Sequence, residues 1–97
     1  MIVDRLIRKR RVSIYKEKLR GQLLNLPFYI DEYYKDIDGT SFIILSKNTE
    51  TKLYILYDRG EYFGYYIRKE YVSGLMYFYS IDNLIQWLKE CMDTNLD

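Results

Sequence analysis

Few side chains in this sequence could take part in catalysis or hold a metal. The chain has no histidine and one cysteine, Cys91. Without histidine, neither a Ser-His-Asp triad nor a Cys-His pair can form, and the nitrogen ligand typical of zinc sites is missing. A single cysteine permits no internal disulfide. We therefore expect no catalytic residues, no metal and no cofactor, and we predict that the protein is not an enzyme.

Four acidic residues lie close together, at Asp31, Glu32, Asp36 and Asp38. Carboxylates bind hard cations such as Ca²⁺, but a calcium-binding loop needs further oxygen ligands at fixed spacings, and these do not follow here. We interpret the cluster as a solvated acidic surface. Cys91 falls on the apolar stripe near the end of a predicted helix, so we expect it to be a buried packing residue rather than a reactive thiol.

The segment DIDGT at residues 36–40 resembles the DxDGT signature of haloacid dehalogenase-type phosphatases. The resemblance implies that Asp36 would be the nucleophile and Asp38 the general acid/base. In that family the motif follows a buried apolar strand of an α/β domain. Residues 30–35 do not have the pattern of such a strand, and no parallel α/β crossover follows. We therefore interpret the segment as a loop with two solvated aspartates and a turn glycine.

Positive charge is concentrated at the N-terminus of a chain whose 97 residues fit one domain. Residues 1–20 carry a net charge of +6, and the remainder carries −5. Arg8, Lys9, Arg10 and Arg11 are consecutive, and the apolar residues before them fall on a different helical side from those after them. We therefore expect a break or a bend there, or residues 1–11 as a loose basic arm. Such an arm is typical of segments that bind phosphates or an acidic patch on a partner.

The spacing of apolar residues predicts an α+β fold with a helix at each end. Apolar residues three or four apart predict an N-terminal amphipathic helix over about 12–24, after which Pro27 either closes the helix or opens the next element. A similar stripe, preceded by Ser80 as its cap, predicts a C-terminal helix over about 81–92. Residues 28–37 fit either a short helix, which we favour because acidic residues suit its first turn, or the start of a strand.

Four apolar runs between the helices predict an antiparallel sheet of three to five strands, at about 42–46, 53–57, 62–67 and 75–79. Residues 58–61 (DRGE) join two of these runs as a hairpin turn. If Arg59 and Gly60 are the turn residues, Tyr57 pairs with Tyr62 and Leu53 with Tyr66. One face of the hairpin then carries Tyr54, Leu56, Phe63, Tyr65 and Ile67. The other carries Leu53, Ile55, Tyr57, Tyr62, Gly64 and Tyr66.

Both hairpin faces are apolar or aromatic, in a chain that has 12 tyrosines. Helices on one side of a sheet cover only one face, and exposed apolar patches usually mark interaction sites. We predict an exposed protein-binding face made of Leu53, Ile55, Tyr57, Tyr62 and Tyr66, where Gly64 lets a partner come close. The alternative is that a helix, either 28–37 or the N-terminal segment, covers this face.

The sequence therefore predicts a small non-catalytic binding protein that acts through a tyrosine-rich surface on a protein partner or a second copy. Such a protein would be an inhibitor, immunity or regulatory factor of a bacterium or mobile element. The alternative is a small nucleic-acid-binding protein, with Arg8, Arg10 and Arg11 on phosphates and exposed tyrosine rings on bases. No small-molecule substrate is expected. No apolar run has the length of a signal-peptide core or a membrane span, so we expect a cytoplasmic protein without a membrane partner.

The order of several short motifs is similar to that in SUKH-type immunity proteins. These motifs are Leu26-Pro27, residues 33–35 (YYK), Asp38-Gly39, the run of strands, and residues 80–84 (SIDNL) at the start of the final helix. The resemblance covers scattered positions and includes no diagnostic residue. It implies a role as an immunity factor, in line with the binding function predicted above.

Overall fold

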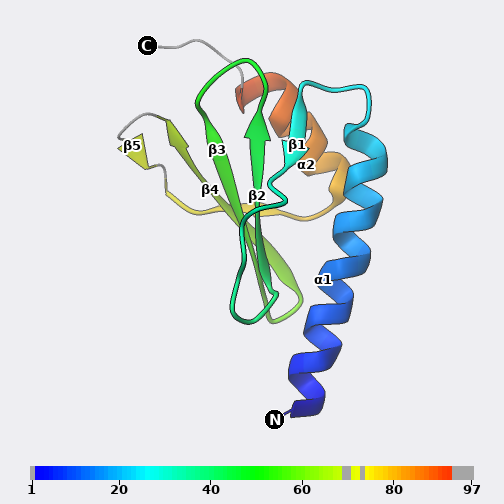
Figure 1. Cartoon of the computed structure of the whole chain (residues 1–97). Helices are drawn as coiled ribbons and strands as arrows, with labels where there is room; N and C mark the ends of the chain where they lie inside the picture. Colours follow the sequence, from blue (N-terminus) through cyan, green and yellow to red (C-terminus); the bar gives the residue numbers. More distant parts are fainter. Residues whose placement is uncertain (1, 69–70, 73, 93–97) are drawn as a thin grey trace.

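The computed structural model describes residues 2–68, 71–72 and 74–92, with the side chains of residues 2–4 and 71 left out. Helix α1 spans Ile2–Leu23 and helix α2 spans Ile81–Trp87, followed by a π-helical turn at Leu88–Met92. The strands are β1 (Phe28–Ile30), β2 (Ser41–Ser46), β3 (Lys52–Asp58), β4 (Glu61–Arg68), β5 (Tyr71–Val72) and β6 (Met76–Phe78). The α+β fold is therefore confirmed (Figure 1).

All strand pairs in the described chain are antiparallel, in the order β1-β2-β3-β4, with β5 and β6 both paired to the far side of β4. The sheet has six strands rather than three to five, because the short strands β1 and β5 join the predicted ones. The predicted register holds: Tyr57 lies opposite Tyr62 and Leu53 opposite Tyr66. Arg59 (φ 52°) and Gly60 (φ 83°) both have positive φ, as a two-residue type I′ turn requires.

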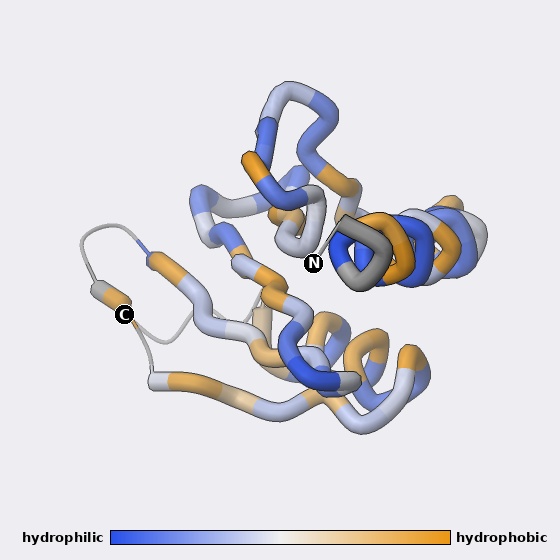
Figure 2. Tube along the Cα trace, turned by 90° about the horizontal axis from the view of Figure 1, so that it is seen from below, coloured by the Kyte–Doolittle hydropathy of each residue, from blue (hydrophilic) through white to orange (hydrophobic). Residues whose placement is uncertain are grey.

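Both helices pack on the same face of the sheet. Figure 1 shows α1 along its flank and α2 behind it, and Figure 2 shows both helices to one side of the strands. Val12, Leu19 and Leu23 of α1 are buried in the same cluster as Leu84, Leu88 and Met92 of the C-terminal segment. The sheet contributes Phe28, Ile30, Phe42, Ile44, Leu53, Ile55, Tyr57 and Phe78 to this cluster.

The predicted break in the N-terminal segment is wrong, because α1 is continuous from Ile2 and includes Arg8–Arg11. Residues 2–20 contain neither glycine nor proline, and arginine, lysine and leucine are good helix formers. Arg11 also stays close to the sheet, since its Nη1 donates to the Tyr57 hydroxyl at 3.4 Å. The four basic residues therefore lie on a helix that is packed on the domain, and not on a loose arm.

The short helix favoured for residues 28–37 is also wrong. Phe28 and Ile30 are buried on either side of exposed Tyr29, which is the period-two pattern of a strand, and β1 pairs with β2. The Asp31 amide extends this pairing by donating to the Ile43 carbonyl at 2.8 Å. An acidic first turn after a proline was therefore a weaker signal than the Phe-Tyr-Ile alternation.

The predicted helix over 81–92 is present, but its last turn is π-helical. Ser80 caps it as predicted, accepting from the Asn83 amide at 3.0 Å. The wider final turn places Leu88 and Met92 in the core, whereas Cys91 is exposed. The prediction that Cys91 is buried is therefore wrong. No helix in the described part of the chain is long and apolar enough to cross a membrane.

Gly64 on β4 leaves room for a ring of the chain itself. A Cβ at this position would lie 2.3 Å from Cε2 of Phe78. We expect Gly64→Ala to lower the free energy of unfolding by roughly 1–3 kcal/mol, because the extra methyl group overpacks the core.

Gly21→Ala is the matched control, because nothing lies within 4 Å of a Cβ at that position of α1. It should raise stability by about 0.5–1 kcal/mol, since glycine is unfavourable in a helix. Urea denaturation of both variants measures the difference. A Gly64→Ala protein as stable as the wild type would show that Phe78 does not pack against this position.

Candidate binding surface

The face predicted to bind a partner is the covered face of the sheet. Leu53 and Ile55 have exposed fractions of 0%, and Tyr57 has 8%. Tyr62 and Tyr66 are half-buried and pack against the core. The predicted exposure of this face is therefore wrong, and the alternative, in which a helix covers it, is confirmed.

Aromatic contacts with both helices close the covered face. The Tyr62 ring stacks on Tyr15 of α1, with 3.8 Å between centroids and 14° between planes. Tyr66 packs against Trp87 of α2, with centroids 5.5 Å apart. The space above Gly64 is filled by Phe78, so it admits no partner. The residue types on the two hairpin faces are too alike to indicate which face the helices cover.

The opposite face carries a continuous apolar and aromatic surface with no helix over it (Figures 1 and 2). We call it the open face and define it by Tyr54, Leu56, Phe63, Tyr65 and Ile67 of β3 and β4, together with Tyr29, Leu45 and Tyr77 of neighbouring strands. Exposed fractions are 38% for Leu56, 43% for Tyr29 and 49% for Tyr77.

The rings of the open face form two rows that follow the strand register. Tyr54 lies opposite Tyr65, and their rings stack with centroids 5.0 Å apart and planes at 8°. The edge of Tyr34 extends this row, at 6.3 Å from Tyr54. In the second row, Phe63 packs on Tyr77 at 4.7 Å. Rings held against one another lose little side-chain freedom when a partner binds, which favours affinity.

The loop that carries the DIDGT segment crosses beside the open face. Tyr34 is held there by a hydrogen bond between its hydroxyl and Ser41 Oγ, 3.1 Å apart. Asp36 Oδ2 accepts from the Thr40 amide at 2.9 Å, and Gly39 takes a positive φ of 68°. Burial acts to raise the pKa of the Asp36 carboxyl, but hydrogen bonds from Thr40 and Ser41 outweigh it and lower the pKa. Asp36 thus shapes a turn, in agreement with the loop interpretation.

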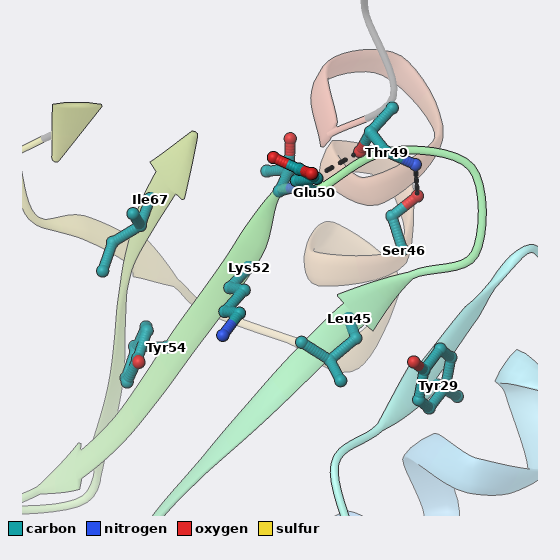
Figure 3. A pocket seen from close by; sticks show the side chains of 9 residues that line it. Tyr29, Leu45, Ser46, Thr49, Glu50, Lys52, Tyr54 and Ile67 are labelled. Atoms are coloured by element: carbon teal, nitrogen blue, oxygen red, sulfur yellow. Dashed lines mark hydrogen bonds between the residues drawn. The ribbon is translucent and has the colours of Figure 1, made fainter. Parts of the chain in front are cut away.

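A hollow lies at one end of the open face (Figure 3). Leu45, Lys52 and Ile67 are directly opposite one another on β2, β3 and β4, and they line its floor. Tyr29 and Tyr54 stand beside this row. Ser46 at the end of β2 and residues 49–51 of the β2–β3 turn complete the lining. Aliphatic groups flanked by one ammonium and one carboxylate group suit an apolar side chain of a partner, with polar contacts at its edge.

The basic residues singled out in the sequence lie on α1, on the side of the sheet opposite the open face. Arg8 is half-buried, and its Nε has no hydrogen-bond partner among the described residues. Lys9 lies against Gly39, where a Cβ would be 2.8 Å from Lys9 Cε. Arg11 donates to Tyr57, and Arg10 is exposed. Arg11 is thus directed to the covered face through Tyr57, whereas Lys9 contacts the loop of residues 36–40.

The described residues contain no group of three or more His, Cys, Asp or Glu side chains that could hold a metal ion. Asp31 accepts from the Tyr33 amide at 2.9 Å, and Glu32 pairs with Arg20 of α1 at 2.9 Å. The acidic residues near the loop therefore stabilise the local backbone and its contact with α1.

Comparisons with protein-family models, with curated proteins and with solved structures give no match to this chain.

Tyr15 offers a test of how the covered face is closed. Its hydroxyl is buried without a hydrogen-bond partner among the described residues, and burial raises its pKa to about 12. Burial also raises the pKa of Tyr62, together with the nearby phenols of Tyr15 and Tyr57. Below pH 10 both phenols are neutral in the folded and in the unfolded chain, so their burial carries no penalty from ionisation. Stability should therefore fall as the pH rises above 10, the ordinary pKa of a tyrosine phenol, at which the phenols of the unfolded chain ionise.

We expect Tyr15→Phe to unfold at pH 7 with a free energy equal to that of the wild type or up to about 1 kcal/mol higher, because it removes an unpaired buried hydroxyl. It should also lose less stability than the wild type between pH 10 and pH 12. Urea denaturation across this range, with Tyr57→Phe as the comparison, measures both effects. A loss of more than about 1 kcal/mol at pH 7 would mean that the Tyr15 hydroxyl has a partner.

Proposed function

We propose that the protein is a non-catalytic binding protein that docks a protein partner on its open face. The single observation that carries this proposal is that both faces of the sheet are apolar and aromatic while the helices cover only one of them. Leaving Leu56, Tyr77 and Tyr29 in water costs free energy that a binding partner recovers. Monomeric proteins rarely keep such contiguous patches without using them in an interaction.

The composition of the open face suits a protein partner. Tyrosine is enriched in the cores of protein interfaces and among the residues that dominate their affinity. Among the described residues of β3 and β4, the charges on this face lie only at its ends, with Lys52 at one end and Asp58 opposite Glu61 at the other. An apolar centre with polar ends is the usual anatomy of a protein interface. By burying a surface of its partner in this way, the protein would act as an inhibitor, immunity or regulatory factor.

The arrangement of charge favours a protein over a nucleic acid. Binding of single-stranded nucleic acid needs rings for the bases and cations for the phosphates on one surface. On the open face, the single positive charge of Lys52 is outnumbered by the negative charges of Asp58 and Glu61. Helix α1, which carries the basic residues, packs on the covered face. The exposed basic side chains of α1 instead suit electrostatic steering toward an acidic partner, which raises association rates.

The proposal predicts that a partner can be crosslinked from the open face. A photoreactive p-benzoylphenylalanine in place of Tyr65 should capture one protein species from a lysate of the source organism, and excess unlabelled wild-type protein should suppress the capture. The same group in place of Ile14, which is 50% exposed on α1, is the control and should not capture that species. Equal capture from both positions, or none from Tyr65, would contradict docking on the open face.

The proposal also predicts weak, nonspecific nucleic-acid binding at most. Labelled single-stranded and double-stranded DNA and RNA are titrated at low and moderate salt, with Arg8, Arg10 and Arg11 intact or all changed to alanine. We expect no binding that survives moderate salt, because the basic residues are not beside the rings. Tight binding that depends on these arginines and falls steeply with salt would favour the nucleic-acid alternative.

A further inference from the structure

The two edges of the sheet are protected to very different degrees. At one edge, β1 has three residues, follows Pro27, and lies against α1. At the other edge, β6 pairs with β4 and with no other strand in the described part of the chain. Edge strands offer unpaired backbone groups to other chains, and proteins normally protect them with charge, proline or a cover.

The segment around β6 has none of the protective residue types. Residues 71–81 (YVSGLMYFYSI) form the longest uncharged stretch of a chain in which charged residues are 30%. At that frequency about three charged residues would be expected in a stretch of this length. The segment also lacks proline. Its sequence therefore resembles that of a strand paired on both sides, although it lies at the edge of the sheet.

Exposure alternates along residues 75–79. Leu75, Tyr77 and Tyr79 are 64%, 49% and 86% exposed, and Phe78 is 5% exposed. When two identical strands pair antiparallel about a twofold axis at Tyr77, this residue faces its own copy and Leu75 faces Tyr79. Residues 75–79 contain no charged residue, so the pairing brings no like charges together.

We infer that two copies of the chain associate through their β6 edges and form one continuous antiparallel sheet. The occupant is a second copy because its own residues 75–79 supply an uncharged strand with matching alternation and no charge conflict. A twofold axis also makes such an interface closed, so that pairing stops at the dimer.

The dimer would join the two open faces side by side. Within one copy, the ring of Tyr77 packs on Phe63, with centroids 4.7 Å apart, and on Tyr79, with centroids 6.2 Å apart. The axis at Tyr77 places the equivalent rings of the second copy next to them. This inference goes beyond the proposed function, because docking on the open face does not require the dimer.

Opposite charges placed at Tyr77 test the inference directly. Sedimentation velocity should show that the mass of the wild type rises toward that of a dimer with concentration. Tyr77→Lys and Tyr77→Glu should each lose the dimer, because two like charges meet on the axis. An equimolar mixture of the two variants should recover it, since the lysine of one copy faces the glutamate of the other.

Leu24→Lys and Leu24→Glu are the matched controls, because Leu24 is 78% exposed and far from β6 in sequence and fold. They should dimerise like the wild type. Amide hydrogen exchange in the unaltered chain is a second readout, and residues 75–79 should become more protected as the concentration rises. A wild type that stays monomeric, or a dimer that survives both Tyr77 variants, would overturn the inference. Neither outcome would affect the crosslinking test from Tyr65.

Discussion

The rest of the structure depends on which face of the β3–β4 hairpin the helices cover, and Gly64 lies on that face. Gly64 is the only residue of β4 without a side chain, and the Phe78 ring lies where its Cβ would be. This contact lets β6 pack close to β4, and α2 follows directly after β6. Tyr62 and Tyr66, on either side of Gly64, then meet Tyr15 and Trp87 of the two helices. Once this face is closed, the alternation of the strands leaves the rings of the other face half-buried or exposed, with no helix over them.

The open face and the β6 edge are both exposed because the described chain has too few helices to cover the whole sheet. Two helices with one apolar stripe each are enough for one face of a six-stranded sheet, and the described chain has no other helix. The open face therefore retains two rows of packed rings. The β6 edge likewise retains an uncharged strand that no other strand of the described chain covers. A binding protein needs surfaces that are apolar and rigid before the partner arrives, and both features meet that need.

The sequence predicted the strands, the hairpin register and the C-terminal helix because these depend on local patterns. Arg59 and Gly60 between two apolar runs were enough to fix the pairing of Tyr57 with Tyr62. The choice of the open face could not be predicted in the same way. Ile55 and Leu56 are both apolar neighbours on one strand, and only the packing of distant helices buries the first and exposes the second. Gly64 among large residues is a sequence signal of close packing at this position. It predicted the approach of a partner, whereas the structure places the Phe78 ring there.

The central claim is that Ile55 and Leu56 lie on opposite sides of the sheet, one covered and one open. The most direct test is the reactivity of a single thiol at each position in a Cys91→Ser background, which removes the exposed native cysteine. With a thiol reagent under native conditions, Leu56→Cys should react much faster than Ile55→Cys, because Leu56 is 38% exposed and Ile55 is 0% exposed. Ile55→Cys should stay protected until the protein unfolds, with circular dichroism confirming that both variants are folded. Fast reaction at position 55 with protection at 56, or equal rates at both, would contradict the account.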